Sequence, residues 1–226
     1  MIFSFAFSLC VAFAVGWLAE RLGWLRPKSA WAAAWVGGLP LWAGGIPAAL
    51  AVILLVALGS IASRLNPKSR DRKGRTALQV LANGLPAALG IALGSPLFFL
   101  GAIATAAADT LATEVGARSS TAWHPLKGPV SSGTNAAISL PGTLGLIVGA
   151  MLFGLFGLAL GQPVWPVALG GITGAFADTL LGLLEDRLEG WSNDLTNLLA
   201  TTLGGLFALG LGSWILYEPG QTHVRL

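Results

Sequence analysis

The phrase Ala-Asp-Thr-Leu occurs twice in this chain, at residues 108–111 and 177–180, each time at the end of a long apolar run. Each copy places a carboxylate, Asp109 or Asp178, in a stretch that otherwise has the composition of a membrane helix. A carboxylate inside a membrane helix is costly unless it faces water, a cation or a partner group. Two matching carboxylates therefore predict a site that is centred on a metal ion or another cation and is built from two parts of the chain.

Further acids follow each copy of the phrase. Asp178 and Glu185 are seven residues apart and share one helical face, whereas Asp109 and Glu114 are five apart, about 140° around a helix. Asp109 and Glu114 share a site only if the helix loosens near Gly116. Carboxylate oxygens with few histidines nearby suit a hard cation such as Mg²⁺. The predicted metal ligands are Asp109, Glu114, Asp178 and Glu185.

Amide side chains are placed near these acids. Gln79 and Asn83 form an i, i+4 pair at the start of one predicted helix. Asn193, Asp194 and Asn197 open the last helix. Asn193 or Asp194 is also a good N-cap, so capping is an equally simple explanation of these two residues.

The loop at 64–75 holds six of the 13 basic residues of the chain. One interpretation is that these residues only signal membrane topology and contact anionic lipid. The other is that Arg70, Lys73 and Arg75 neutralise phosphate oxygens, because the loop leads directly into the helix that carries Gln79. Basic groups beside Mg²⁺-binding acids are what polyphosphate chemistry requires.

The loop at 124–135 is rich in Gly, Ser and Thr. Its free backbone N–H groups can form an anion-binding nest at the following helix start. Lys127 is the predicted phosphate contact within it, whereas we expect His124 to form local hydrogen bonds. The other candidate phosphate-binding residues of this loop are Gly133, Thr134 and Asn135.

The composition identifies an integral membrane protein. Of the 226 residues 54% are hydrophobic and 10% are charged, and the mean hydropathy is +0.74, whereas about 25% of a soluble domain is charged. Cys10 is the single cysteine, which excludes an internal disulfide, and two histidines are too few for a zinc cluster. The net charge of +3 is small, and no nucleic-acid partner is expected.

The apolar runs predict one transmembrane domain, residues 1–226, of the all-α class with seven or eight membrane helices. The first residues lack the basic start of a signal peptide, so the first helix is expected to stay on the protein. The segment 30–44 is short and interrupted by Gly and Pro, so it either spans or is re-entrant. The expected helices are at 2–19, 30–44, 47–63, 75–93, 96–116, 135–160, 164–185 and 195–216.

Alternation of these helices places the loops 20–29, 64–75, 117–134 and 186–194 on one side. Twelve of the 13 basic residues then lie on that side, and only Arg225 lies opposite. The positive-inside rule makes that side cytoplasmic and the N-terminus external. A re-entrant 30–44 moves the N-terminus inside. The predicted location is the cell membrane, or an equivalent organelle membrane, with the active-site loops facing the cytoplasm.

The ordered set of these segments resembles the transmembrane protein 19-like family over roughly residues 5–215. Its plastid members include the phytyl-phosphate kinase of tocopherol synthesis. The resemblance implies transfer of a phosphoryl group from CTP to a membrane-embedded isoprenyl monophosphate. More distantly, the acid-rich helix end and the loop after it are similar to dolichol kinases and CDP-lipid synthases. The segments that carry the resemblance are 69–84, 108–116, 133–139, 177–182 and 193–197.

The resemblance also implies which residues act. Ala136 stands where the family pattern has glycine, which is a departure in the phosphate loop. The matching positions are Asn83, Asp109, Glu114, Lys127, Asn135, Asp178 and Asn197.

We therefore expect an Mg²⁺-dependent phosphotransferase that converts a prenyl monophosphate, phytyl phosphate first among them, to its diphosphate. Its partners are the lipid bilayer, the prenyl phosphate and a nucleoside triphosphate, CTP or another. Asp109, Glu114 and Asp178 form the expected catalytic centre. The alternatives are a secondary transporter or flippase for a lipid or anionic substrate, which would place its acids at the membrane midplane, and a CTP-dependent lipid nucleotidyltransferase.

Overall fold

The computed structural model describes residues 3–185 and 187–216, and that part of the chain is mainly helical. Five of its helices are long and apolar enough to cross a membrane, and α3 is a shorter apolar helix. The predicted all-α membrane fold is therefore confirmed. The elements are α1 (Phe5–Arg21), α2 (Ala30–Leu65), α3 (Ala77–Ala92), α4 (Pro96–Gly116), β1 (Ala122–His124), β2 (Gly128–Val130), α5 (Leu140–Phe156), the 3₁₀ turn η1 (Gly157–Leu160), α6 (Val164–Glu185) and α7 (Asn193–Leu216).

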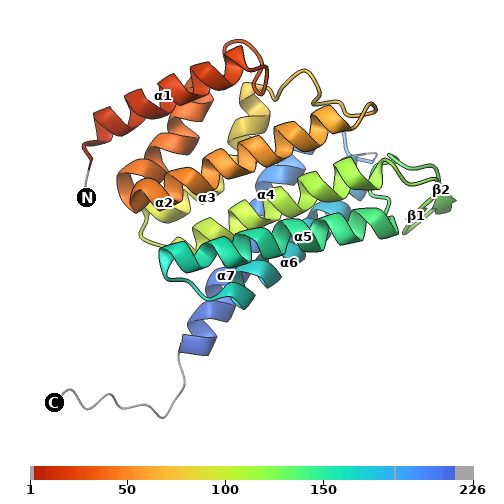
Figure 1. Ribbon diagram of the computed structural model, residues 1–226. Coiled ribbons are helices and arrows are strands. Elements are labelled where there is room, and N and C mark those ends of the chain that lie inside the picture. The colour runs from red at the N-terminus through yellow and green to blue at the C-terminus, as the bar shows by residue number, and fades with distance from the viewer. Residues whose placement is uncertain (1–2, 186, 217–226) are drawn as a thin grey trace.

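The two helices predicted at 30–44 and 47–63 are the two limbs of α2. Gly45 leaves helical geometry with φ 69° and ψ −161°, and Pro47 follows it inside the element. A positive φ is accessible to glycine without a Cβ clash, and proline removes a backbone donor, so the chain bends sharply here. Figure 1 shows the limbs meeting at the end of the molecule away from the β hairpin. The second limb returns to the end at which α2 began.

The helix predicted at 135–160 begins later than expected, at Leu140. Ser139 caps it by accepting a hydrogen bond from the Gly142 N–H at 3.2 Å, and Pro141 occupies the first turn, where its missing N–H costs nothing. Before the cap, Ile138 pairs with Trp123 in an antiparallel bridge. The short hairpin β1–β2, which the sequence did not predict, lies beside this segment.

Helix α4 lies at the centre of the bundle and contacts α2, α3, α5, α6 and α7. Small residues let the backbones approach closely: a Cβ added at Gly149 would lie 2.8 Å from the Ala107 carbonyl oxygen, and one at Gly171 would lie 2.7 Å from the Ala104 Cβ. Close approach of this kind is the usual way membrane helices associate. The packing holds α4 on several sides and so fixes the position of Asp109.

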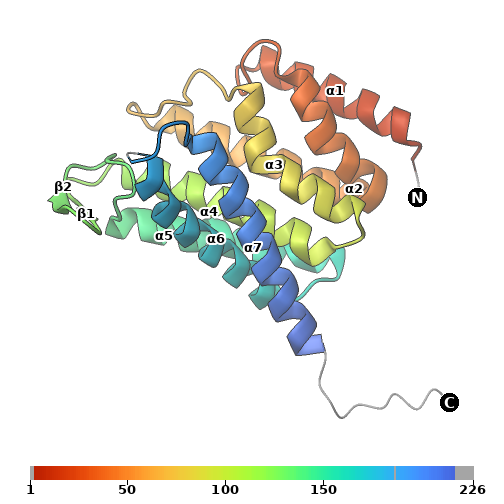
Figure 2. The ribbon, with the colours of Figure 1, turned by 180° about the vertical axis from the view of Figure 1, so that it is seen from behind.

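All of the polar loops lie at one end of the bundle, and the turn at Gly45 and the α3–α4 and α5–α6 turns lie at the other (Figures 1 and 2). The α1–α2 loop is hydrogen-bonded to the loop at residues 64–75, hereafter the basic loop. The Arg26 N–H donates to the Arg75 carbonyl at 2.8 Å, and the Arg75 N–H donates to the Trp24 carbonyl at 3.1 Å. The prediction that these loops share one face is therefore confirmed. Their assignment to the cytoplasm stays a prediction.

That assignment can be tested with single cysteines in a Cys10→Ser background. Ser120 lies in the loop after α4, and Leu93, which is 86% exposed, lies in the α3–α4 turn at the other end. In intact cells a membrane-impermeant maleimide should label Leu93→Cys and leave Ser120→Cys unlabelled until the membrane is opened, because the basic residues stay inside. Labelling of both cysteines from the same side of the membrane would contradict the topology.

Candidate functional site

A cavity of about 1030 Å³ lies at the loop end of the bundle, and most of the residues singled out in the sequence line it. They come from the basic loop, the loop before α5, and helices α3, α4, α6 and α7. The predicted residues in its wall are Arg70, Arg75, Asn83, Asp109, Glu114, Gly133, Thr134, Asn135, Asp178, Glu185 and Asn197.

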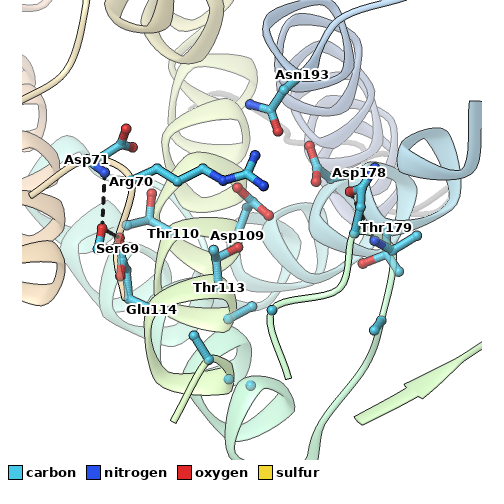
Figure 3. Close-up of a pocket in the computed structure, with 18 of the residues that line it drawn as sticks. Ser69, Arg70, Asp71, Asp109, Thr110, Thr113, Glu114, Asp178, Thr179 and Asn193 are labelled. Atoms are coloured by element: carbon cyan, nitrogen blue, oxygen red, sulfur yellow. Dashed lines mark hydrogen bonds between the residues drawn. The ribbon is translucent and has the colours of Figure 1, made fainter. Parts of the chain in front are cut away.

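The two repeated carboxylates face each other across this cavity. The carboxyl groups of Asp109 of α4 and Asp178 of α6 are close enough to influence each other, and Figure 3 shows both in the wall of the pocket. The Oδ1 atom of Asp178 is buried without a hydrogen-bond partner among the described residues. Two buried carboxyl groups this close together are favourable only if they share a proton or have a cation nearby. The arrangement thus has the donor chemistry of a cation site.

Arg75 is the cation that interacts with Asp109. Its Nε lies 4.0 Å from Asp71 Oδ2, and its guanidinium lies against Gly59 of α2, where a Cβ would collide with it. Burial lowers the pKa of Arg75, and the carboxylates of Asp71, Glu114 and Asp109 oppose that shift. Because residue 59 is glycine, the Arg75 guanidinium has room beside these carboxylates.

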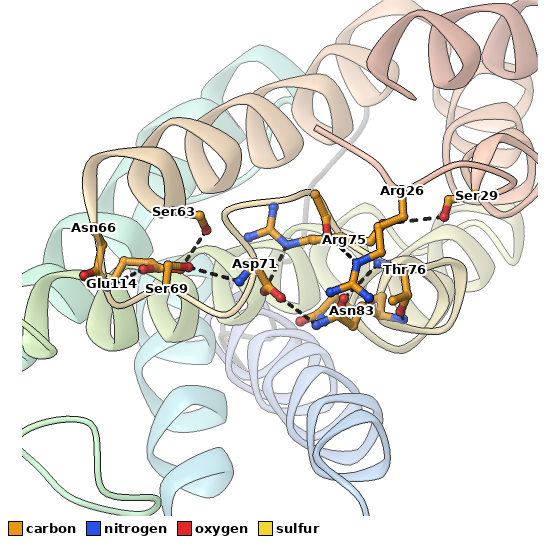
Figure 4. A network of polar contacts seen from close by, with 12 residues as sticks. Arg26, Ser29, Ser63, Asn66, Ser69, Asp71, Arg75, Thr76, Asn83 and Glu114 are labelled. Carbon is orange, nitrogen blue, oxygen red and sulfur yellow. Dashed lines mark hydrogen bonds and ion pairs between the residues drawn. The ribbon is translucent and has the colours of Figure 1, made fainter. Parts of the chain in front are cut away.

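Glu114 takes a different position from the one the sequence suggested. Helix α4 stays helical through Gly116, so the loosening that would bring Glu114 beside Asp109 does not occur. Its carboxylate is buried and accepts hydrogen bonds from Ser63 Oγ (2.6 Å), Ser69 Oγ (2.6 Å) and Asn66 Nδ2 (2.7 Å), as Figure 4 shows. Through these hydrogen bonds Glu114 connects the end of α2 and the basic loop to α4.

Glu185 is held by the loop before α5. Asn135 Nδ2 donates to Glu185 Oε2 at 3.1 Å and to the Gly182 carbonyl at 3.0 Å. Within residues 3–185 and 187–216 no group of three or more His, Cys, Asp and Glu side chains forms a metal cluster. The structure therefore assembles the pair Asp109–Asp178 and not the predicted set of four ligands. Asp186, the next acid after Glu185, lies outside the described residues.

The loop before α5 turns at two residues with positive φ, and its role as an anion-binding nest stays a prediction. Gly133 has φ 85°, and Ala136, where the family pattern has glycine, has φ 57°. A non-glycine residue in this region costs roughly 1–2 kcal/mol. The Asn135 side chain supports the turn by accepting from the Ala136 N–H at 3.0 Å. Ala136 thus has the backbone conformation that glycine would favour at this position.

The amide pair of α3 has separate tasks. Gln79 completes a capping box with Thr76, and its Nε2 also donates to Asp71 Oδ1 at 2.9 Å. Asn83 Nδ2 donates to the Gln79 carbonyl at 3.0 Å, and Asn83 lines the cavity. Gln79 therefore orients Asp71, an acid whose role the sequence does not indicate.

The start of α7 is capped by neither of the two candidates. Ser192 Oγ accepts a hydrogen bond from the Leu195 N–H at 3.2 Å, so Ser192 is the capping residue. Asn193, Asp194 and Asn197 instead line the cavity. The capping explanation of Asn193 and Asp194 is therefore wrong.

Two predicted phosphate contacts, Lys73 and Lys127, are absent from the cavity wall in the described part of the chain. Lys127 lies between β1 and β2, where its N–H donates to His124 Nδ1 at 3.2 Å. Leu126 N–H donates to the same atom at 3.1 Å. The local role expected of His124 is confirmed. Arg26, which the sequence did not suggest, lines the cavity because its loop pairs with Arg75.

Comparison with known proteins identifies the family to which the chain belongs. Residues 10–205 match the family model described as integral membrane protein DUF92. The chain belongs to this family. A relative from Methanocaldococcus jannaschii, described as an uncharacterized membrane protein, is 34% identical over 177 residues, which cover 70% of this chain and 74% of the relative. No solved structure matches the chain.

The fastening role of Glu114 predicts a change in the basic loop that needs no activity assay. Glu114→Gln leaves some of the three donors of Ser63, Ser69 and Asn66 unsatisfied, which costs about 1–3 kcal/mol. In detergent, trypsin should therefore cleave after Arg70 and Arg72 several times faster than in the unaltered protein. The exposed Glu189→Gln is the matched control. An unchanged rate of cleavage in Glu114→Gln would contradict this role.

Proposed function

We propose that the protein is an Mg²⁺-dependent phosphotransferase, which takes a phosphoryl group from a nucleoside triphosphate, CTP first among the candidates, and transfers it to a membrane prenyl monophosphate. An oxygen of the prenyl phosphate attacks the γ-phosphorus, the bond from that phosphorus to the β,γ-bridging oxygen breaks, and a prenyl diphosphate and a nucleoside diphosphate form. Phytyl phosphate is the acceptor that the resemblance of the motif segments to the transmembrane protein 19-like family favours.

One observation carries the proposal: a close carboxylate pair and several basic side chains share one cavity. Asp109 interacts with both Asp178 and Arg75, and Arg26 and Arg70 line the same wall. Acids that hold a metal and cations that neutralise phosphate oxygens are the two components that phosphoryl transfer needs. A purely structural cavity accounts for neither the buried acids nor the guanidinium groups beside them.

The donor set of the pair suits Mg²⁺. The unpartnered Oδ1 of Asp178 and the carboxylate of Asp109 are hard oxygen donors, and Mg²⁺ binds through one or two carboxylates together with substrate phosphates and water. Asp109 and Asp178 would hold such an ion, which would supply positive charge to stabilise the phosphoryl group in the transition state.

The remaining residues of the wall bind and orient. Arg70, whose side chain extends over the pocket in Figure 3, and Arg75 would balance the charge of the triphosphate. Asn83 and Asn197 would donate hydrogen bonds to it. No general base is needed because the acceptor is already an anion, so positioning and charge stabilisation supply most of the rate.

The depth of the site agrees with an acceptor anchored in the membrane. Asp109 and Asp178 each lie seven residues, about 10 Å, before the end of their helices. Leu146 and Phe176 also line the cavity, and Phe176 is 43% exposed. These apolar residues would face the first isoprenyl units while the phosphate head reaches the carboxylate pair.

The direct test is incubation of purified protein in lipid nanodiscs with γ-labelled CTP, Mg²⁺ and phytyl or geranylgeranyl phosphate. The proposal expects a labelled prenyl diphosphate and CDP. Release of pyrophosphate with a CMP-linked lipid would instead indicate nucleotidyl transfer. Absence of any labelled or CMP-linked lipid, with every nucleoside triphosphate tried, would contradict enzymatic activity on these substrates.

Asp109→Asn and Asp178→Asn should each abolish turnover and leave the protein folded. The amide keeps the shape of the side chain and removes the charge that holds Mg²⁺. Activity should be measured over a range of Mg²⁺ concentrations, with the exposed Glu189→Gln as a control that stays close to normal. Near-normal turnover of either aspartate variant at limiting Mg²⁺ would remove that residue from the site.

The basic loop offers a matched comparison. Arg70→Gln and Arg75→Gln should each lose about 1–3 kcal/mol of nucleotide interaction, the scale of a charge-assisted hydrogen bond. Lys73→Gln removes a charge from the same loop but not from the cavity wall, and it should be nearly neutral. The measurement is the dependence of rate on nucleotide and on lipid substrate. Equal small effects of all three changes would contradict nucleotide binding by the loop and would leave membrane topology as its role.

A further inference from the structure

Trp191 is part of the cavity wall and has no role in the transfer described above. It lies between α6 and α7, beside the start of α7, and lines the same cavity as Asp109 and Asp178. Its indole Nε1 donates to Thr196 Oγ1 at 3.0 Å, and Thr196 is only 1% exposed. This bond uses the single donor of the indole and fixes the orientation of the ring. The aromatic face of Trp191 is therefore the part of the side chain that can contact a ligand.

The aromatic side chains of the wall differ in depth. Among the described residues, Trp191 and Phe176 are the aromatic side chains that line the cavity. Phe176 lies nine residues before the end of α6, about 13 Å inside it, whereas Trp191 lies beyond that end. The carboxylate Asp178 lies between them in depth. From the loop end inward, the wall therefore presents an aromatic face, the acidic and basic groups, and then an apolar side chain.

We infer that Trp191 is the stacking surface for the nucleobase of the phosphoryl donor. The inference rests on the proposed function, because it needs a nucleotide whose triphosphate reaches Asp109 and Asp178. A base placed at the loop end extends its phosphate chain inward, toward Arg75 and the carboxylate pair. Every base has a π-face, so an aromatic platform of this kind binds bases with little dependence on their identity. The prenyl chain takes the deeper, apolar side near Phe176.

The test compares two probes that share a phosphate chain. CTP carries a base, and inorganic tripolyphosphate does not. Affinities of both are measured at equilibrium with Mg²⁺ for the full-length protein and for Trp191→Leu, Trp191→Phe and Trp165→Leu. Trp165 is 64% exposed at the start of α6, so Trp165→Leu is a matched control far from the site.

We expect Trp191→Leu to weaken CTP binding roughly 5- to 150-fold, the range seen when base-stacking aromatics are removed. Binding of tripolyphosphate should stay within about twofold of the unaltered protein. Trp191→Phe keeps an aromatic face and should retain most of the affinity for CTP, and Trp165→Leu should change neither probe.

Two outcomes would overturn the role of Trp191 alone. One is unchanged CTP binding in Trp191→Leu, and the other is an equal loss for CTP and tripolyphosphate, which would show a structural effect on the phosphate site. Failure of the unaltered protein to bind either probe would instead contradict the proposed function, and the role of Trp191 with it. The comparison of probes thus separates the two failures.

Discussion

Two carboxyl groups that lie close together inside a helical bundle must share a proton or a cation, and this requirement applies to Asp109 and Asp178. The cavity at the loop end of the bundle gives water or an ion access to them. The pair also requires α4 and α6 to stay close together. Glycines on α6 provide this closeness, since a Cβ at Gly171 would lie 2.7 Å from that of Ala104. The tight packing and the cavity are therefore two consequences of one constraint.

The loops around the cavity are each fastened to a helix by a carboxylate or an amide. Glu114 holds the basic loop through Ser69 and Asn66. Asn135 holds the loop before α5 through Gly182 and Glu185. Gln79, in the first turn of α3, donates a hydrogen bond to Asp71 of the basic loop. Such bonds orient the cavity wall before a ligand arrives, and preorganised charge is the main source of electrostatic catalysis.

The sequence predicted the parts of the site that follow from local chemistry. The cost of a carboxylate in an apolar run identified Asp109 and Asp178, and the distribution of basic residues placed the four loops together. The glycines and the proline near residue 45 separated the two limbs of α2, because their backbone preferences are local, whereas the start of α5 was predicted five residues too early. These features need no knowledge of which helices are neighbours.

The remaining features depend on tertiary contacts that no local pattern encodes. The sequence predicts Glu114 as a metal ligand, whereas its carboxylate accepts hydrogen bonds from Ser63 and Ser69. Arg26 enters the wall only because its loop pairs with that of Arg75, and Lys127 is kept outside the wall by the β hairpin. Family membership establishes an integral membrane protein, and the chemistry proposed for it rests on the cavity.

The most direct test of the central claim is whether the carboxylate pair joins metal and triphosphate at one point. Mn²⁺ can replace Mg²⁺, and pulsed electron paramagnetic resonance with a non-hydrolysable CTP analogue detects coupling between the metal and phosphorus nuclei. We expect one coupled Mn²⁺ per chain, and we expect it to disappear in the double variant Asp109→Asn/Asp178→Asn while the Glu189→Gln protein keeps it. The same coupling in the double variant would contradict the account, because the metal and the triphosphate would then meet elsewhere.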